Sequence, residues 1–452
     1  MKNFPKTVHL LSLGCAKNLV DSEVMLGLLR EEGWIPSPHG RATVAIINTC
    51  AFIKEAKMES LTAILEAAQA KERGQYEYLV VTGCLPQRYR ATLTQELPEV
   101  DLFLGLEYIP QLAKFLNRLV QKKLPRREFV RRPTFLYDHQ TPRLLSTAPG
   151  SAYIKIAEGC ANCCAYCVIP QIRGKLRSRK INSVIEEAEG LVGQGVKEIN
   201  LIAQDITNYG RDLRRSGDLT NLLKRLVKVP GLKWIRLLYA HPAHIDNNLI
   251  SVIKEEEKIC KYLDLPLQHI DDQILTAMNR PYTGAQVRQL LEQIRKEVPE
   301  MVLRTSLIVG FPGETEKKFQ RLLDFVKEAQ FDHLGVFIYS REEGTAAANL
   351  KGHVPERVKE ERYRQIMLAQ RKISWRKQKE KVGRVMEVLI EEPAKRKGIL
   401  WQGRTPGQAP EVDGVTFLNK GKAARGEIKR VLITKATAYD LYGEILDAEE
   451  GA

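Results

Sequence analysis

The sequence contains no apolar stretch long enough to cross a membrane. No run reaches the roughly 18 consecutive apolar residues that a membrane-spanning helix needs. The first residues, Met1–Lys6, also lack the apolar segment of a secretory signal peptide. We therefore expect a soluble protein of the cytoplasm that has no membrane partner.

Cysteine is scarce, with eight residues in a chain of 452. In a long cytoplasmic chain, cysteines are metal ligands or reactive thiols more often than disulfide partners. The length suits about two to four domains. A hydrophobic content of 44% can fill ordinary cores.

Acidic residues are outnumbered by basic ones, 55 against 70, which gives a net charge of +15. This excess favours contact with a polyanion, and the ribosome or RNA is the obvious candidate. A basic protein without such a partner would have the same composition, so charge alone does not decide.

Strand-like and helix-like patterns alternate over the first 145 residues and predict a parallel sheet with crossover helices. Three apolar runs are each followed by a cysteine at the predicted carboxyl end of a strand. Ligands bind at that edge of open α/β sheets, and neighbouring strands lie about 5 Å apart. Three thiols there can converge on one metal cluster, although a single buried cysteine is usually a packing residue. The runs are Val8–Gly14, Val44–Thr49 and Tyr78–Gly83, followed by Cys15, Cys50 and Cys84.

A second group of cysteines has the spacing C-x3-C-x2-C and uses Cys160, Cys164 and Cys167. Three thiolates within eight residues can hold one soft metal centre, and no fourth ligand follows at the usual spacing. A structural zinc site needs four protein ligands, whereas a four-iron cluster on three cysteines keeps one iron open. The spacing favours the cluster over a zinc site completed by a distant ligand. Cys163 is a spare thiol, and Cys260 is expected to be a packing residue.

Six strand–helix units follow one another from about residue 153 to residue 339 and predict a partial parallel barrel. Chemistry in such barrels lies at the carboxyl ends of the strands, and the C-x3-C-x2-C loop follows the first strand. Other strand ends carry Gln204-Asp205, Gln268-His269 and Gly310-Phe311-Pro312. These are weak signals alone, and an isolated His269 is more often a core or capping residue. The predicted strands are Tyr153–Ile156, Glu198–Ala203, Trp234–Tyr239, Tyr262–Leu267, Val302–Val309 and Leu334–Tyr339.

The remaining segments are rich in Lys and Arg or in short strands. Residues 116–133 are predicted to end a helix and to form a linker, and residues 355–381 to form a long charged helix. Residues 382–445 predict a small antiparallel barrel of OB-like type, with 14 basic and 12 acidic residues from Lys377 to Ala452. That balance is weak support for a dedicated RNA surface. The predicted domains are residues 1–145, 146–375 and 376–452, all within an α/β fold class.

With these motifs in place, the chain resembles the methylthiotransferases of the radical S-adenosylmethionine (SAM) superfamily. The resemblance runs from about Val8 to Ile445 and includes the order three-cysteine domain, radical SAM barrel, TRAM domain. The sequence motifs are similar to those of the branch that modifies a ribosomal protein. The tRNA-modifying branch typically has Gln-Met-Asn after the first cysteine. Cys163 and Pro281 depart from the pattern. The segments that carry the similarity are Gly14–Glu23, Asn48–Ile53, Ala157–Cys160, Ala203–Asp205 and Pro266–His269.

This resemblance implies two 4Fe-4S clusters and SAM as cofactors. The cluster on Cys160, Cys164 and Cys167 would cleave SAM, and the cluster on Cys15, Cys50 and Cys84 would deliver sulfur. The implied substrate is an aspartate of ribosomal protein S-twelve within the small ribosomal subunit, with RNA contact and an electron donor such as flavodoxin or ferredoxin. Arg173-Gly174 is also expected near the cofactor. The residues expected to bind SAM are Arg179, Gln204, Gln268, Gly310 and Pro312.

Two alternatives remain open at this point. The same chemistry on a tRNA adenosine would suit the positive charge, although the sequence motifs favour the ribosomal branch. A non-catalytic, metal-containing RNA-binding scaffold would suit the charge and the small terminal barrel. An open coordination position at both cysteine sites would separate an enzyme from a scaffold.

Overall fold

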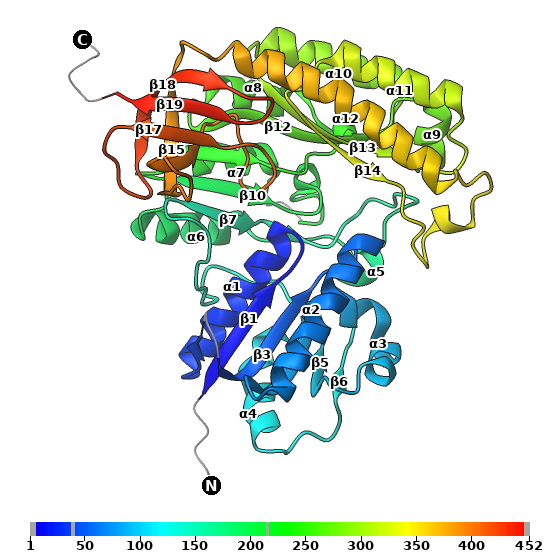
Figure 1. The fold of residues 1–452 in the computed structure, drawn as a ribbon, viewed down its shortest axis with the longest axis vertical. Helices are drawn as coiled ribbons and strands as arrows, with labels where there is room; N and C mark the ends of the chain where they lie inside the picture. The colour runs from blue at the N-terminus through cyan, green and yellow to red at the C-terminus, as the bar shows by residue number, and fades with distance from the viewer. Residues whose placement is uncertain (1–5, 38–40, 214–216, 447–452) are drawn as a thin grey trace.

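The computed structural model describes residues 6–37, 41–213 and 217–446. The chain forms an N-terminal α/β unit, a central open barrel and a small C-terminal β-barrel (Figure 1). This confirms the predicted fold class. Residues 1–5 of the first predicted domain and 447–452 of the last lie outside the described residues. Residues 1–5 also make up most of the segment Met1–Lys6, on which the signal-peptide expectation rests. No helix within the described ranges is long and apolar enough to cross a membrane.

A six-stranded parallel sheet in the order β2-β1-β3-β4-β5-β6 forms the N-terminal unit. The fully buried central strand β3 explains why its sequence reads as one continuous apolar run. Its strands are β1 (Thr7–Ser12), β2 (Ile35–Pro36), β3 (Ala42–Thr49), β4 (Tyr76–Gly83), β5 (Leu102–Leu104) and β6 (Glu128–Phe129). Its helices are α1 (Ala16–Glu31), α2 (Lys54–Glu72), α3 (Cys84–Glu96), η1 (Leu106–Gln111) and α4 (Leu112–Val120).

Part of the basic segment 116–133 belongs to this unit and is not a free linker. The strand β6 adds an edge to the sheet by pairing with β5. Arg127 donates hydrogen bonds to the main-chain carbonyls of Thr94, Pro98 and Val100. The linker prediction was therefore wrong at residues 128–129, because a two-residue strand is too short to leave a periodic pattern.

Helix α1 is buried on both faces. Val20 and Val24 face the sheet and are at most 1% exposed, as the sequence pattern predicts, and burying each contributes about 1.5–3 kcal/mol. The polar residues Asn18, Asp21 and Glu23 are also buried. They are covered because α1 lies between the N-terminal sheet and β7, the first strand of the central barrel (Figure 1).

The central unit is an open barrel of six parallel strands in the order β7-β10-β11-β12-β13-β14, and each predicted strand is present. The strands are β7 (Ser151–Lys155), β10 (Glu198–Ile202), β11 (Trp234–Leu237), β12 (Ile259–Gln268), β13 (Val302–Val309) and β14 (His333–Ile338). A two-stranded pair, β8 (Ala157–Glu158) and β9 (Arg177–Ser178), flanks the cysteine loop.

Helices cover the outside of this barrel. The long charged helix predicted after Pro355 is α12, which packs on α11 and β14. The α-helices are α5 (Ile169–Arg173), α6 (Ile181–Gly193), α7 (Leu219–Leu226), α8 (Asn247–Glu255), α9 (Asp272–Ala277), α10 (Gly284–Glu297), α11 (Glu316–Ala329) and α12 (Glu356–Lys379). Single 3-10 turns are η2 (Ile206–Asn208), η3 (Pro242–His244) and η4 (Ala346–Asn349).

The C-terminal unit is a closed five-stranded barrel, and its pairings are antiparallel except for β17 with β19. It packs on the amino ends of the central strands, where Tyr262 donates to Asp413 at 2.7 Å. The N-terminal unit packs at the carboxyl ends, where the cysteine loop lies. The strands are β15 (Val385–Pro393), β16 (Trp401–Arg404), β17 (Thr416–Lys420), β18 (Ile428–Ala436) and β19 (Leu441–Ile445).

A buried carboxylate fixes this small barrel to the central one. Glu198, at the start of β10, accepts hydrogen bonds from Arg236 at 2.8 Å and from Arg404 of β16 at 2.6 Å. Burial raises the pKa of Glu198, but the two guanidinium charges hold it far below its usual value. Removing one partner from such a cluster leaves a buried charge unpaired and costs about 3–5 kcal/mol of stability.

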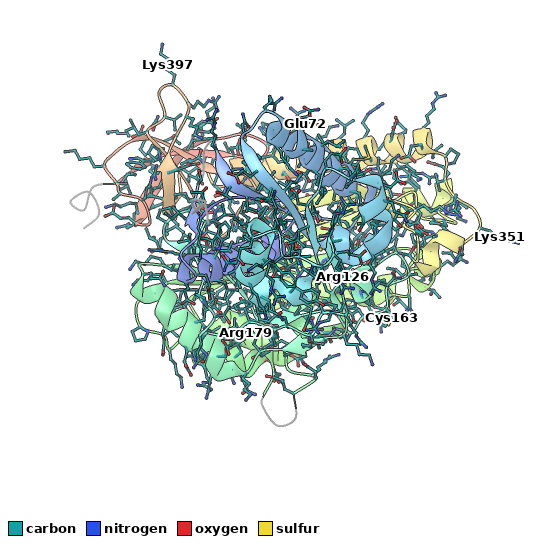
Figure 2. The ribbon with its side chains drawn as sticks, turned by 90° about the horizontal axis from the view of Figure 1, so that it is seen from below. Glu72, Arg126, Cys163, Arg179, Lys351 and Lys397 are labelled. Carbon is teal, nitrogen blue, oxygen red and sulfur yellow. The ribbon has the colours of Figure 1, made fainter. Side chains whose placement is uncertain are left out.

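Replacing Arg404 with Met tests this docking. We expect Arg404→Met to destabilise the protein by about 3 kcal/mol, because Glu198 keeps only Arg236 as a cationic partner. Urea unfolding followed by circular dichroism measures the change. Lys397→Met is the control, because Lys397 projects from the β15–β16 loop (Figure 2) and surface substitutions change stability by about 0.5 kcal/mol or less. Equal stability of the two variants would contradict the docking role.

Candidate active site

The first three cysteines, here called the N-terminal triad, lie at the carboxyl ends of three adjacent strands. Cys15 follows β1 at the start of α1, Cys50 directly follows β3, and Cys84 opens α3 directly after β4. Thr49 pairs with Gly83 across β3 and β4, so Cys50 and Cys84 leave the sheet at the same level. This is the arrangement that the sequence predicts.

Two glycines allow the chain to turn into these positions. Gly14 has φ +87°, and a Cβ there would lie 2.7 Å from the Cβ of Cys50. Gly83 has φ +93°, and a Cβ there would lie 2.4 Å from Oδ1 of Asn48 and 2.6 Å from the carbonyl oxygen of Thr49. Other residues rarely adopt this backbone region, so glycine is required at both turns.

The second group, Cys160, Cys164 and Cys167, is here called the loop triad and lies between β8 and α5. The amide of Cys160 donates to the carbonyl of Gly174 at 3.2 Å, and the amide of Ala165 donates to that of Met278 at 2.9 Å. Cys163 is exposed, apart from the half-buried triad. These hydrogen bonds fix the loop at the carboxyl end of the barrel from two sides.

Burial makes four of the six triad thiols, Cys50, Cys84, Cys160 and Cys167, poorly suited to carry negative charge unaided. Burial raises the pKa of Cys84 to about 12, that of Cys160 to about 11 and that of Cys167 to about 12. Burial also raises the pKa of Cys15, but the charges of Lys17 and Arg173 outweigh it and lower that pKa overall. A bound metal centre would provide the positive charge that deprotonates such thiols.

The sulfur atoms of neither triad are gathered as closely as the ligands of a single zinc ion. Thiolates around a single Zn²⁺ lie about 3.8 Å apart, given a Zn–S bond of about 2.3 Å and tetrahedral geometry. Among the residues that the structure describes, neither cysteine triad is among the groups whose three ligand atoms all lie within 4.8 Å of one another. Three soft donors without a fourth protein ligand fit an iron–sulfur cluster, which has several metal atoms.

The one described group that is this tight consists of Asp205, His241 and His244. The carboxylate of Asp205 already accepts from the side chains of Asn162 at 2.7 Å and Asn208 at 2.8 Å, from His244 at 3.2 Å, and from the amide and hydroxyl of Thr207. A carboxylate has about four lone-pair sites, so none is left for a metal. Asp205 instead fixes Asn162, which lies within the cysteine loop.

Among the predicted SAM-binding residues, Arg179 already has partners. Its guanidinium pairs with Glu187, donates to the hydroxyl of Ser183 at 2.9 Å and lies 4.5 Å from the centre of the Tyr137 ring. A SAM carboxylate would have to displace Glu187. Contact between Arg179 and SAM stays a prediction, and no local pattern in the sequence indicates these partners.

The other predicted SAM-binding residues lie at the carboxyl ends of the barrel strands. Gln204 and Gln268 are half-buried, and Gly310 and Pro312 are buried after β13. Gly310 has φ +74°, and a Cβ there would lie 2.3 Å from Cγ of Lys359, so α12 alone explains the glycine. Gln268 has φ +68°, a left-handed conformation that costs a non-glycine residue about 1–3 kcal/mol and is typical of functional sites.

His269 behaves as the sequence favours, as a structural residue. It is fully buried, its Nε2 lies 3.2 Å from Glu314, and its Nδ1 accepts from the amide of Asp271 at 3.0 Å.

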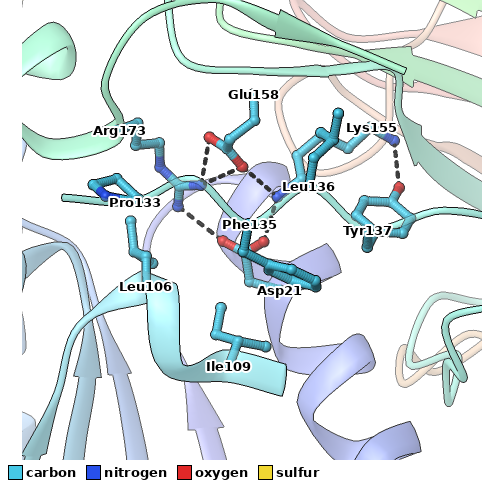
Figure 3. A pocket seen from close by; sticks show the side chains of 10 residues that line it. All are labelled: Asp21, Leu106, Ile109, Pro133, Phe135, Leu136, Tyr137, Lys155, Glu158 and Arg173. Atoms are coloured by element: carbon cyan, nitrogen blue, oxygen red, sulfur yellow. Dashed lines mark hydrogen bonds and ion pairs between the residues drawn. The ribbon is translucent and has the colours of Figure 1, made fainter. Parts of the chain in front are cut away.

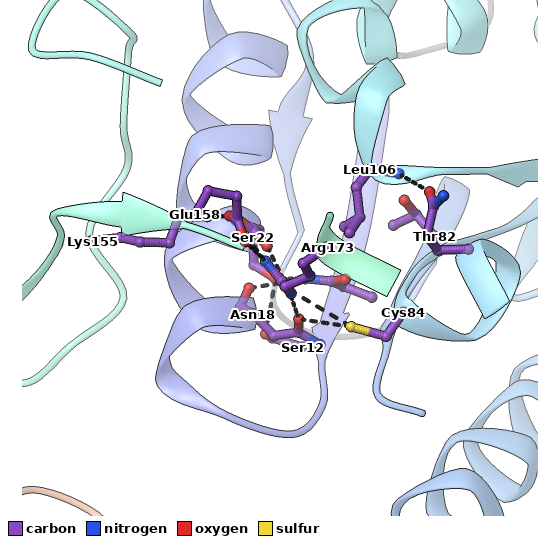
Figure 4. A network of polar contacts seen from close by, with 12 residues as sticks. Ser12, Asn18, Ser22, Thr82, Cys84, Leu106, Lys155, Glu158 and Arg173 are labelled. Atoms are coloured by element: carbon purple, nitrogen blue, oxygen red, sulfur yellow. Dashed lines mark hydrogen bonds and ion pairs between the residues drawn. The ribbon is translucent and has the colours of Figure 1, made fainter. Parts of the chain in front are cut away.

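A buried polar network joins the two triads, and most of it was missed by sequence reasoning. We call it the interface network (Figures 3 and 4). Arg173 donates to Glu158 at 3.0 Å, to Asp21 at 2.9 Å and to Oδ1 of Asn18 at 2.5 Å. Its Nη2 also lies 3.7 Å from Sγ of Cys84. The network consists of Asn18, Asp21, Lys155, Glu158 and Arg173.

The network is connected to the loop triad by two short main-chain links. Glu158 lies two residues before Cys160, and Gly174, which follows Arg173, accepts the hydrogen bond from Cys160. Lys155 pairs with both Asp21 and Glu158. Burial raises the pKa of Glu158, but Arg173 and Lys155 hold it far below its usual value. The cavity beside the network has room for about one water molecule, so it is not a cofactor pocket.

The turn at Gly83 gives a direct test of the N-terminal triad. We expect Gly83→Ala to lower the iron content of reconstituted protein by about half, because Cys84 is displaced while the loop triad is untouched. Iron analysis measures this. Gly190→Ala on α6 is the control, since its Cβ would have no atom within 4 Å and alanine favours helices. Full iron content in Gly83→Ala would contradict the placement.

Known families match all three structural units. The description "Uncharacterized protein family UPF0004" matches residues 7–105, the radical SAM superfamily matches residues 154–326, and the TRAM domain matches residues 382–446. The matches include both cysteine triads.

Solved structures show the same fold at low sequence identity. The radical SAM methyltransferase TsrM from Kitasatospora setae, solved with cobalamin and a 4Fe-4S cluster, has a TM-score of 0.55 at 16% identity and covers 76% of this chain and 77% of its own. The cobalamin-dependent SAM radical enzyme OxsB has a TM-score of 0.51 at 12% identity and covers 81% of this chain and 56% of its own.

Curated relatives are similar over nearly the whole chain. The ribosomal protein uS12 methylthiotransferase RimO of Desulforamulus reducens is 48% identical, over 97% of this chain and 99% of its own. The protein of that name from Geobacter sulfurreducens is 50% identical, over 99% of this chain and 100% of its own. With this identity over its full length, and with both cysteine triads in place, the chain belongs to the family of ribosomal protein uS12 methylthiotransferases.

Proposed function

We propose that this protein adds a methylthio group to the β-carbon of an aspartate in ribosomal protein uS12. The observation that supports this most is the meeting of two three-cysteine sites at one domain interface, joined by Arg173. A site for a single reaction step needs only one such centre. Two adjacent centres suit a reaction that must both activate a carbon and deliver sulfur to it.

The loop triad would hold one 4Fe-4S cluster and the N-terminal triad the other, each leaving one iron without a protein ligand. When bound, these clusters and SAM supply hydrogen removal from the unactivated carbon, together with the sulfur and the methyl group. The protein holds the loop triad through Asn162 and Asp205, and holds the N-terminal triad through the turns at Gly14 and Gly83.

SAM would lie at the carboxyl ends of the barrel strands, beside the loop triad. Gln204, Gln268, Gly310 and Pro312 are proposed contacts there, supported by the location of the strand ends and by the left-handed backbone of Gln268. Contact between Arg179 and SAM is a weaker proposal because Glu187 already neutralises the charge of Arg179. The N-terminal unit covers this edge and would exclude water from the reacting groups.

The substrate uS12 is expected to be basic, as is this chain at +15, so the two proteins alone would repel each other. Ribosomal RNA in the small subunit would supply the compensating negative charge, and the TRAM domain is a candidate for that contact. We infer that the protein acts in the cytoplasm, with flavodoxin or ferredoxin as the electron donor.

The two rival functions receive less support. Modification of a tRNA adenosine would use the same sites, but the curated relatives described above, about half identical over the full chain, carry the uS12 name. A scaffold without catalysis would not need three-cysteine sites that leave a coordination position open.

Separate loss of the two triads tests the proposed roles. Wild-type protein should hold about eight irons, four for each cluster. Replacing Cys15, Cys50 and Cys84 with Ala should leave about four irons and SAM cleavage, while methylthiolation of uS12 is lost. The double variant Cys163→Ala and Cys260→Ala is the control and should keep both. Zinc in place of iron, or methylthiolation by the triple variant, would refute the proposal.

The substrate is tested in a strain that lacks the gene. Mass spectrometry should show that uS12 has lost its methylthio group, while the methylthio groups of tRNA are unchanged. Loss from tRNA alone would identify the rival function.

A further inference from the structure

Each cysteine triad has one buried arginine at a sulfur atom. Nη2 of Arg173 lies 3.7 Å from Sγ of Cys84, and Nη1 of Arg280 lies 3.5 Å from Sγ of Cys164. The two arginines are 2% and 7% exposed. Hydrogen bonds from charged donors are stronger than neutral ones, and burial strengthens them further because water does not screen the charge.

The surroundings of Arg173 hold its guanidinium in one orientation. Nη1 donates to both carboxylate oxygens of Glu158, at 3.0 and 3.1 Å, and Nη2 donates to Asp21 at 2.9 Å. Asn18 accepts at 2.5 Å and is itself fixed, since its amide donates to the carbonyls of Leu13 and Thr49 at 2.9 Å. The arginine therefore cannot turn away from Cys84 without breaking several buried hydrogen bonds.

The interface network contains two cations and two carboxylates, Lys155 and Arg173 with Asp21 and Glu158. Its charges cancel, so it does not itself need the sulfur as a partner. The two hydrogens of Nη2 are shared among Asn18, Asp21 and Sγ of Cys84, so Arg173 places a positive charge 3.7 Å from the sulfur and donates only a weak hydrogen bond to it. Nearby charge and hydrogen bonds to the sulfurs are among the factors that set the reduction potential of an iron–sulfur cluster.

We propose that Arg173 is a positioning residue that raises the reduction potential of the cluster on the N-terminal triad, while it holds this triad against the barrel. This inference rests on the proposed function, which places a cluster on Cys15, Cys50 and Cys84. The added electron makes the cluster more negative, and a buried cationic donor stabilises the more negative state. Arg280 has the same relation to the loop triad and supplies a matched comparison.

The test measures the potential of each cluster alone in the full-length protein. A Cys160→Ala, Cys164→Ala, Cys167→Ala background keeps only the N-terminal cluster, and a Cys15→Ala, Cys50→Ala, Cys84→Ala background keeps only the loop cluster. Each is titrated anaerobically with dithionite and redox mediators, and the reduced cluster is followed by electron paramagnetic resonance (EPR). Iron content is measured on every variant.

We expect Arg173→Gln to lower the potential in the first background and to leave it unchanged in the second. Arg280→Gln should do the reverse, and Arg173→Lys should restore part of the loss because it keeps the charge. Asp21→Asn should raise the potential of the N-terminal cluster, because it keeps a hydrogen-bond acceptor and removes a negative charge beside Arg173. A general loosening of the interface would not produce shifts of opposite sign.

An unchanged potential in Arg173→Gln with full iron content would overturn the inference, as would equal shifts in both backgrounds. If the Arg173→Gln variant does not hold iron, the Asp21→Asn variant provides the test. An unchanged or lowered reduction potential of its N-terminal cluster would refute the role of Arg173. Absence of iron from the first background with Arg173 intact would instead refute the proposed function.

Discussion

The buried ion pairs between α1 and the cysteine loop are the constraint on which the two sites depend. Asp21 belongs to the N-terminal unit, whereas Glu158 and Arg173 belong to the barrel. Transferring a charge out of water costs several kcal/mol per ion, and this cost is offset only when every charge is paired. The paired geometry therefore favours a single docking of the two units and fixes the separation of the cysteine triads.

A second buried contact supports the same docking from the other side of the interface. Glu342, in the segment after β14, accepts from Lys57 and Arg88 of the N-terminal unit, both at 2.7 Å. The small C-terminal barrel contributes at the opposite end, where Arg404 neutralises Glu198. The central barrel is thus closed at its amino end by one unit and covered at its carboxyl end by another. Both cysteine triads lie at the covered end.

The sequence predicts the features that are local. Buried parallel strands appear as continuous apolar runs, so β3, β4 and the six barrel strands could be found, and the cysteines after them follow directly. Contacts between distant segments leave no such pattern. Asp21 lies 134 residues from Lys155 and 152 residues from Arg173 in sequence. The close approach of Lys359 to Gly310 likewise leaves no local pattern, because α12 lies far along the chain.

If both triads hold clusters at one shared interface, the two clusters lie close together. EPR of the fully reduced protein with both clusters present tests this proximity, because two nearby unpaired spins broaden each other's signals. We expect a spectrum that is broader than the sum of the spectra from the two single-triad variants. A spectrum equal to that sum would contradict the claim that the two centres adjoin.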